Sequence, residues 1–212
     1  MILDLNTIDK NGSYTFSDYF SLSIQIDTLL NFFGFSFKNK AIDFKNMENF
    51  KHYNSLKKSI STILERVVLS GESSRREFLI APVIGQLLVE FDDFQISTEK
   101  IIKFDNLLKG KLDYFLSTNS CFLVLEAKNE NMESGLKQLA TQMIAVDKIL
   151  QTKKNQTKNL YGVISTGIEW KFVILDREKK EFLFDMNLYF LPNDLEKILG
   201  IIIKLLNLEG KK

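Results

Sequence analysis

Two apolar runs joined by a short polar turn, in the segment LDYFLSTNSCFLVLEAKNE at residues 112–130, constrain the fold of this chain more than any other feature. Runs rich in Phe, Leu and Val are typical of buried strands, and the turn between them predicts a hairpin. Charged residues interrupt both runs, Asp113 in the first and Glu126 and Lys128 in the second. Because a buried charge costs free energy unless it is paired, the hairpin has to supply both core and a polar site.

The spacing of these charges predicts that they meet. Side chains alternate across a strand, so Glu126 and Lys128 share one face while Leu125 and Ala127 point to the other. With the residues TNS at the turn, Asp113 lies opposite Glu126. Two carboxylates held close repel each other unless a cation lies between them. Oxygen ligands suit Mg²⁺, and a lysine beside them can orient a water and offset charge on a phosphate, so the arrangement suits hydrolysis of a phosphodiester.

Periodicity along the chain predicts an α/β fold in which a mixed β-sheet is flanked by helices. Residues 1–70 are expected to form a mostly helical N-terminal accessory region, packed on a core domain of residues 71–212. Ser74 and Glu77 fit a capping box at the start of a helix. Apolar stripes predict helices, and alternating runs predict strands, in the following ranges: helices at 24–33, 46–70, 72–91, 133–150 and 193–206, and strands at 35–44, 94–103, 112–117, 122–128, 160–166, 169–177 and 181–190.

Composition excludes several classes of protein. The formal net charge is +1, so any nucleic-acid contact must come from local patches. Cys121 is the only cysteine and His52 the only histidine, which excludes an internal disulfide and disfavours zinc sites and histidine triads. The sequence contains no GxxxxGK[ST] phosphate loop, and no run of about 18 apolar residues that could cross a bilayer. The start does not resemble a signal peptide, so a cytoplasmic protein with no membrane contact is expected.

The residues of the hairpin resemble a known family. Asp113 followed by Glu126-Ala127-Lys128 looks like the core motif of the PD-(D/E)xK nuclease superfamily, with Leu112 in the place of its hallmark proline.

The resemblance extends to both sides of the hairpin. The segment ESSRREFLIAPVI looks like the opening helix in the N-terminal nuclease domains of type I restriction enzyme R subunits. The segment GLKQLATQM is similar to their Q-x-x-x-Y helix, with Gln138 at the glutamine and Gln142 in place of the tyrosine. The strand pair in YGVISTGIEWKFVIL is similar to the one that follows in that family, so the likeness covers residues 70–180.

The resemblance implies a restriction-endonuclease-like fold and a role for each matching residue. Asp113 and Glu126 would bind Mg²⁺, with Mn²⁺ as a substitute, and the carbonyl of Ala127 would be a further ligand. Lys128 would position the attacking water, and Gln138 would hold the site or touch the substrate.

Other residues are expected at the edge of the site. A glutamate of the opening helix would be an outer metal ligand; Glu72 is favoured and Glu77 is its competitor. Substrate contacts are expected from Gln142, beside Gln138, and from Lys153 and Lys154 in the basic loop QTKKNQTKN, which could meet a phosphate backbone.

The sequence therefore predicts a Mg²⁺-dependent, restriction- or defence-related nuclease that hydrolyses DNA and has no ATP motor of its own. One such site cuts one strand at a time, so cutting both strands would need a homodimer or two encounters. Two alternatives stay open at this point. One is a nuclease that acts on RNA or on particular nucleic-acid structures, and the other is a nucleic-acid-binding or scaffold module that keeps the fold with weak or no catalysis.

Overall fold

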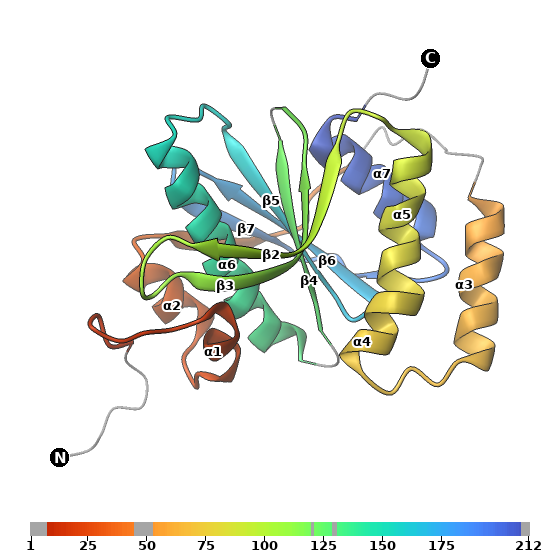
Figure 1. Cartoon of the computed structure of the whole chain (residues 1–212), viewed down its shortest axis with the longest axis horizontal. Coiled ribbons are helices and arrows are strands. Elements are labelled where there is room, and N and C mark those ends of the chain that lie inside the picture. Colours follow the sequence, from red (N-terminus) through yellow and green to blue (C-terminus); the bar gives the residue numbers. More distant parts are fainter. Residues whose placement is uncertain (1–7, 45–52, 120, 129–130, 209–212) are drawn as a thin grey trace.

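A computed structural model describes residues 8–44, 53–119, 121–128 and 131–208. The predicted α/β class is confirmed, since the described chain forms an eight-stranded mixed sheet with helices on both faces (Figure 1). His52 lies outside the described residues. Within the described residues, no helix is both long and apolar enough to cross a membrane.

The sheet has the strand order β1-β7-β6-β5-β4-β3-β2, with the short β8 paired to β6. The pairs β4–β5 and β1–β7 are parallel, and the remaining pairs are antiparallel. The strands are β1 (Ser36–Lys40), β2 (Gln95–Lys103), β3 (Lys109–Ser117), β4 (Phe122–Ala127), β5 (Asn159–Ser165), β6 (Glu169–Asp176), β7 (Glu181–Asp185) and β8 (Tyr189–Phe190). Residues 112–130 thus contain most of β3 and all of β4, the two strands that carry Asp113 and Glu126.

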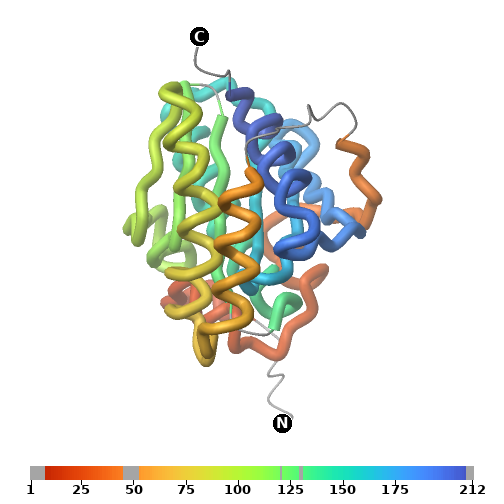
Figure 2. The backbone as a smooth tube through the Cα atoms, turned by 90° about the vertical axis from the view of Figure 1, so that its right-hand side faces the viewer, coloured from red at the N-terminus to blue at the C-terminus, as the bar shows by residue number. Residues whose placement is uncertain are grey.

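Helices form a layer on each face of the sheet. The helices α1 (Phe16–Ser21), α2 (Ile26–Phe32) and α6 (Met132–Thr152) lie on one face (Figure 1). The helices α3 (Asn54–Arg66), α5 (Ala81–Glu90) and α7 (Leu195–Leu206) lie side by side on the other, as Figure 2 shows. Each layer covers its own apolar cluster, and β4 serves both, because Val124 faces α6 while Leu125 faces the opposite layer. This alternation leaves Glu126 on the α6 face.

The helix that opens the motif region begins earlier than the capping box predicts. Helix α4 (Glu72–Arg75) starts at Glu72, with Gly71 as the N-cap residue, and continues through the π-helical turn η1 (Arg76–Ile80) into α5. The prediction of Ser74 as N-cap was therefore wrong. The Ser74 hydroxyl instead exchanges hydrogen bonds with the backbone of Gly71, and Glu77 lies inside η1. The earlier start places Glu72 in the first turn of the helix.

The N-terminal residues join the sheet as well as covering it. Strand β1 pairs in parallel with β7 at one edge, and α1 and α2 pack against α6. The first described helix is thereby brought beside the hairpin, close to the ends of β3 and β4.

Helix α6 packs closely on the sheet at Gly162 of β5. A Cβ atom at this position would lie 2.5 Å from Met143 Sδ and 3.2 Å from Leu139 Cδ2. The glycine therefore sets the distance at which α6, and the side chains it carries, lie over the sheet.

Replacing Gly162 with Ala should lower the free energy of unfolding by about 1–3 kcal/mol, because it overpacks a filled core. The matched control is Gly85→Ala in α5, where an added Cβ meets nothing within 4 Å. This control should raise the free energy of unfolding by about 0.5–1 kcal/mol, since alanine loses less backbone entropy than glycine in a helix. Urea unfolding of both variants tests the packing, and a Gly162→Ala protein as stable as the wild type would contradict it.

Candidate functional site

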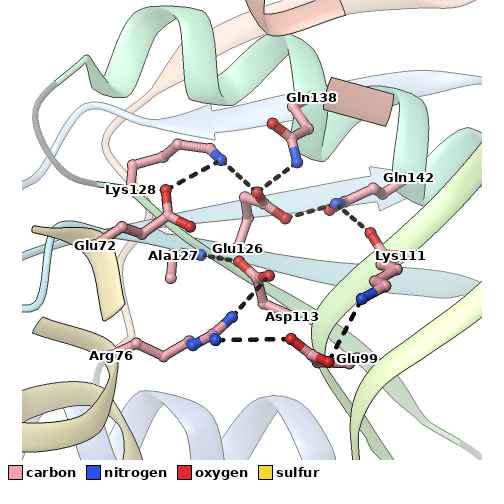
Figure 3. Close-up of polar contacts among 10 residues, drawn as sticks. All are labelled: Glu72, Arg76, Glu99, Lys111, Asp113, Glu126, Ala127, Lys128, Gln138 and Gln142. Carbon is pink, nitrogen blue, oxygen red and sulfur yellow. Dashed lines mark hydrogen bonds and ion pairs between the residues drawn. The ribbon is translucent and has the colours of Figure 1, made fainter. Parts of the chain in front are cut away.

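The charged residues Asp113, Glu126 and Lys128 lie close together, as Figure 3 shows. They line an open cleft of about 790 Å³ beside the start of β3 and the end of β4. One wall comes from α1, another from the start of α4, and a third from α6. The cleft is lined by Thr15, Phe16, Ser17, Phe20, Ser21, Glu72, Gly110, Lys111, Asp113, Glu126, Lys128, Asn131 and Gln138. Of the four predicted catalytic residues, Glu126 lies on β4 and Lys128 directly after it, Asp113 lies on the neighbouring β3, and Gln138 reaches them from α6.

Glu126 is the most deeply buried of these residues, with only 1% of its surface exposed. Gln138 Nε2 donates to its Oε1 at 2.5 Å, and Gln142 Nε2 donates to its Oε2 at 2.5 Å. Gln138 and Gln142 are four residues apart, so they lie one turn from each other on the α6 face that covers β4. Helix α6 thus donates a hydrogen bond to each oxygen of the buried Glu126 carboxylate.

The environment of Glu126 raises its pKa to about 7. Burial is the largest cause and the nearby charge of Asp113 is the second, while Lys128 and Gln142 act in the opposite direction. The carboxyl group therefore changes its charge near neutral pH, and a further cation beside it would favour the ionised form.

Lys128 follows β4 directly and is also buried. Its backbone N–H donates to the carbonyl of Ser165 at 2.7 Å, which extends the pairing of β4 with β5 by one residue. Its ammonium lies 2.6 Å from Glu126 Oε1 and 3.8 Å from Glu72 Oε2. Gly135 of α6 leaves room for this side chain, since a Cβ there would lie 2.8 Å from Lys128 Cγ.

Asp113 takes the position that the sequence predicts for it. The β3–β4 register pairs Tyr114 with Leu125, and one further step places Asp113 opposite Glu126. Its Oδ2 accepts a hydrogen bond from the N–H of Ala127 at 2.9 Å. That bond fastens the aspartate to the motif Glu126-Ala127-Lys128.

Arg76 is a site residue that sequence reasoning missed. Its guanidinium lies 3.4 Å from Asp113 Oδ1 and 3.7 Å from Glu99 Oε1, and Lys111 Nζ lies 3.5 Å from the other oxygen of Glu99 (Figure 3). The available signal was its spacing of four residues from Glu72, which puts both on one side of the opening helix. Arg76 therefore provides a cation for Asp113 from within the chain.

The remaining predicted residues divide into those near the cleft and those far from it. Glu72 lines the cleft, whereas Glu77 is exposed and is not among the lining residues. Lys153 and Lys154 are exposed just beyond the C-terminal end of α6. With a rise of 1.5 Å per residue, they lie roughly 22 Å along the helix from Gln138.

The donor atoms fit a hard divalent cation. The described residues contain no group of three or more His, Cys, Asp or Glu side chains that could hold a metal. Mg²⁺ does not need one, because it keeps several waters and takes one or two carboxylates. Glu126 Oε2 and Asp113 Oδ1 each accept a single hydrogen bond from the described chain, so each keeps a lone pair for a further partner. These two oxygens, with the carbonyl of Ala127, could hold Mg²⁺.

Comparison with protein-family models gives no match to this chain, and comparison with curated proteins gives none either. The geometry and electrostatics of the cleft are therefore the basis of the functional inference.

The raised pKa of Glu126 predicts a pH dependence of stability in the metal-free protein. Between the ordinary pKa of 4.5 and about 7, the folded state binds more protons than the unfolded state. The free energy of unfolding should then fall as pH rises through this window, by at most about 1.4 kcal/mol per pH unit from this group. Glu126→Gln, which carries no titratable group there, should lose this part of the slope.

Urea unfolding in EDTA between pH 5 and pH 8 measures the effect. Glu178→Gln is the matched control, because Glu178 lies in the exposed turn between β6 and β7 and does not line the cleft. It should keep the wild-type slope. A Glu126→Gln protein with an unchanged slope would show that this carboxyl group titrates normally.

Proposed function

We propose that this protein is a Mg²⁺-dependent nuclease that hydrolyses DNA phosphodiester bonds without an ATP motor in this polypeptide. The observation that carries the proposal is the buried Glu126–Lys128 ion pair beside Asp113, at the floor of an open cleft. An acid and a lysine buried together in a core strand serve stability poorly, because both charges must be desolvated. Their position in a cleft gives the pair a chemical use.

The strand arrangement supports the likeness to the restriction-endonuclease-like fold. A long helix is followed by three antiparallel strands, a crossover helix and a strand that pairs in parallel with the third. Asp113 lies on the second of these strands, and Glu126 and Lys128 lie on or directly after the third. We infer a restriction- or defence-related role from this likeness alone.

In this proposal, Asp113, Glu126 and the carbonyl of Ala127 hold Mg²⁺, for which Mn²⁺ can substitute. Glu72 acts on the outer side, where it already approaches Lys128. The bound cation would supply charge stabilisation for the phosphate and activation of a water.

The chain's own groups orient the reactants. A lysine ammonium has three donors, and that of Lys128 directs one to Glu126 and lies near Glu72. The other donors can orient the attacking water or offset charge on the phosphate in the transition state. Gln138 and Gln142 keep the Glu126 carboxylate fixed while this happens.

A different candidate function is a nucleic-acid-binding module without catalysis. The observation that favours it is the internal neutralisation of both carboxylates, Asp113 by Arg76 and Glu126 by Lys128. With these partners the site can exist without a metal. The response to Mg²⁺ separates the two functions.

The first test is cleavage. Purified protein should nick plasmid DNA in Mg²⁺ or Mn²⁺ and not in EDTA, and nicking before linearisation would indicate one active site per encounter. Lys128→Ala should reduce the rate by about 100-fold or more, as for other groups that act on the transition state. Lys179→Ala is the matched control, since Lys179 pairs with Asp176 on an exposed turn away from the cleft.

Circular dichroism should accompany this assay, because Lys128→Ala leaves a buried carboxylate without its cation. A folded Lys128→Ala protein that cleaves at the wild-type rate would remove Lys128 from the mechanism. A wild-type protein that cleaves neither DNA nor RNA in either metal would contradict the nuclease proposal itself.

The second test is metal binding. Mg²⁺ should raise the melting temperature of the wild type, with a gain of about 2.7 kcal/mol at a concentration 100-fold above the dissociation constant. Asp113→Asn keeps an oxygen acceptor for the Ala127 N–H but removes a metal ligand, so its melting temperature should not respond to Mg²⁺.

Thermal melts in EDTA and in excess Mg²⁺ measure both proteins. Asp27→Asn, which changes an exposed acid on α2, is the control and should respond like the wild type. A wild-type melting temperature that does not change with Mg²⁺ would favour the nucleic-acid-binding module without catalysis.

A further inference from the structure

Helix α1 places the aromatic ring of Phe20 directly beside Lys128. The ring centroid of Phe20 lies 5.3 Å from Lys128 Nζ, within the range of a cation–π contact. Phe20 is half-buried and borders the cleft, whereas its neighbour Phe16 is buried in the core. Phe20 therefore offers an apolar surface at the point where a phosphate would meet Lys128.

The wall that carries Phe20 is built into the fold. The Tyr19 hydroxyl donates to the carbonyl of Leu107 at 2.8 Å, and Thr15 forms a parallel bridge with Lys109. Phe16 packs on Gly110, where a Cβ would lie 2.9 Å from the ring. At the other end, the Lys137 ammonium of α6 donates to the carbonyl of Leu22. These contacts hold α1 against β3 and α6, so that Phe20 stays beside Lys128.

Charge alone would bind a nucleic-acid backbone weakly in this cleft. Its lining residues include three acids and two lysines, namely Glu72, Asp113, Glu126, Lys111 and Lys128. The whole chain carries a formal net charge of only +1. Non-specific binding to duplex DNA comes mainly from cations that neutralise phosphates, and this cleft has few of them. Contact with a base has to supply part of the affinity.

An aromatic ring beside a phosphate site can reach a base only if that base is unpaired. In a duplex, each base is stacked between its neighbours, and extracting it costs a few kcal/mol. In a single strand the base faces are free, and stacking on an aromatic side chain binds them without regard to sequence. The exposed hydroxyls of Ser17 and Ser21 lie on the same wall and can donate to the sugar–phosphate backbone.

We propose that the cleft takes an unpaired strand of nucleic acid, and that the base next to the phosphate at Lys128 stacks on Phe20. This inference names the substrate class of the proposed nuclease and so rests on that function. DNA and RNA strands share the recognised chemistry, a free base face beside a phosphate. Wherever the protein acts on duplex DNA, the reacting strand would be locally unpaired.

The experiment measures binding separately from cleavage. Fluorescence anisotropy in EDTA compares a short labelled single strand, as DNA and as RNA, with a blunt hairpin duplex of the same sequence. The wild type should prefer the single strand. Phe20→Ala should weaken single-strand binding by about fivefold or more, as expected for one lost stacked base, and leave duplex binding unchanged. Phe20→Tyr, which keeps the ring, should bind like the wild type.

Phe104→Ala is the matched control. Phe104 is also partly exposed, and it also makes a cation–π contact, with Lys148 Nζ 5.7 Å from its ring centroid. Unlike Phe20, it does not line the cleft. This variant should bind both probes like the wild type. An equal loss in Phe104→Ala would show that any exposed ring on this protein has the same effect, and would overturn the assignment of Phe20.

The other outcomes separate this inference from the proposed function. Equal binding of the single strand by Phe20→Ala and the wild type, an equal loss on both probes, or a wild-type preference for the duplex would overturn the inference, even if Mg²⁺-dependent cleavage is observed. The expected binding pattern without any cleavage in Mg²⁺ or Mn²⁺ would leave the strand site standing and reject the nuclease. The DNA and RNA arms then identify which unpaired strand the cleft takes.

Discussion

The burial of the Glu126 carboxylate is the constraint on which the rest of the site depends. An ionised carboxylate removed from water is unstable unless its oxygens are hydrogen-bonded and its charge is balanced. Glu126 receives the ammonium of Lys128 and the amides of Gln138 and Gln142. Strand β4 and helix α6 therefore have to meet at one separation, and the sequence meets this need with a small residue at the contact, Gly135.

The same constraint links stability to chemistry through the balance of charge. Asp113 raises the pKa of Glu126, because its negative charge disfavours the ionised form of Glu126 in the metal-free protein. Arg76 and Lys128 offset part of this repulsion. The proposed divalent cation would offset the rest, and its binding energy would come partly from relief of that repulsion. A site that were fully neutralised from within would gain little from a metal, so the long 3.4 Å contact of Arg76 is compatible with exchange for a stronger partner.

Local patterns in the sequence predicted the parts of the site that lie close together in the chain. The alternation in residues 112–130 gave the hairpin, the face shared by Glu126 and Lys128, and the position of Asp113 in the register. The helical spacing of Gln138 and Gln142 put both on one side of α6. These features follow from periods of 2 and 3.6 residues, which a sequence carries directly. The N-cap of the opening helix was assigned to the wrong residue, because the Ser74-x-x-Glu77 pattern also fits positions inside a helix that begins at Glu72.

Contacts between distant segments could not be predicted in this way. The spacing of Arg76 from Glu72 places both on one side of the opening helix, but the sequence does not indicate that Arg76 meets Asp113, which is 37 residues away. Residues 1–70 carried no motif, yet they supply the wall of the cleft at Phe20. The wall is placed by contacts between segments far apart in the chain, such as the hydrogen bond from the Tyr19 hydroxyl to the carbonyl of Leu107. The proposed catalytic side chains are therefore grouped on one hairpin and one helix, while the aromatic wall of the cleft comes from a segment distant from them in the chain. Under the two proposals above, we expect changes in that segment to alter nucleic-acid binding without disturbing the Glu126 network.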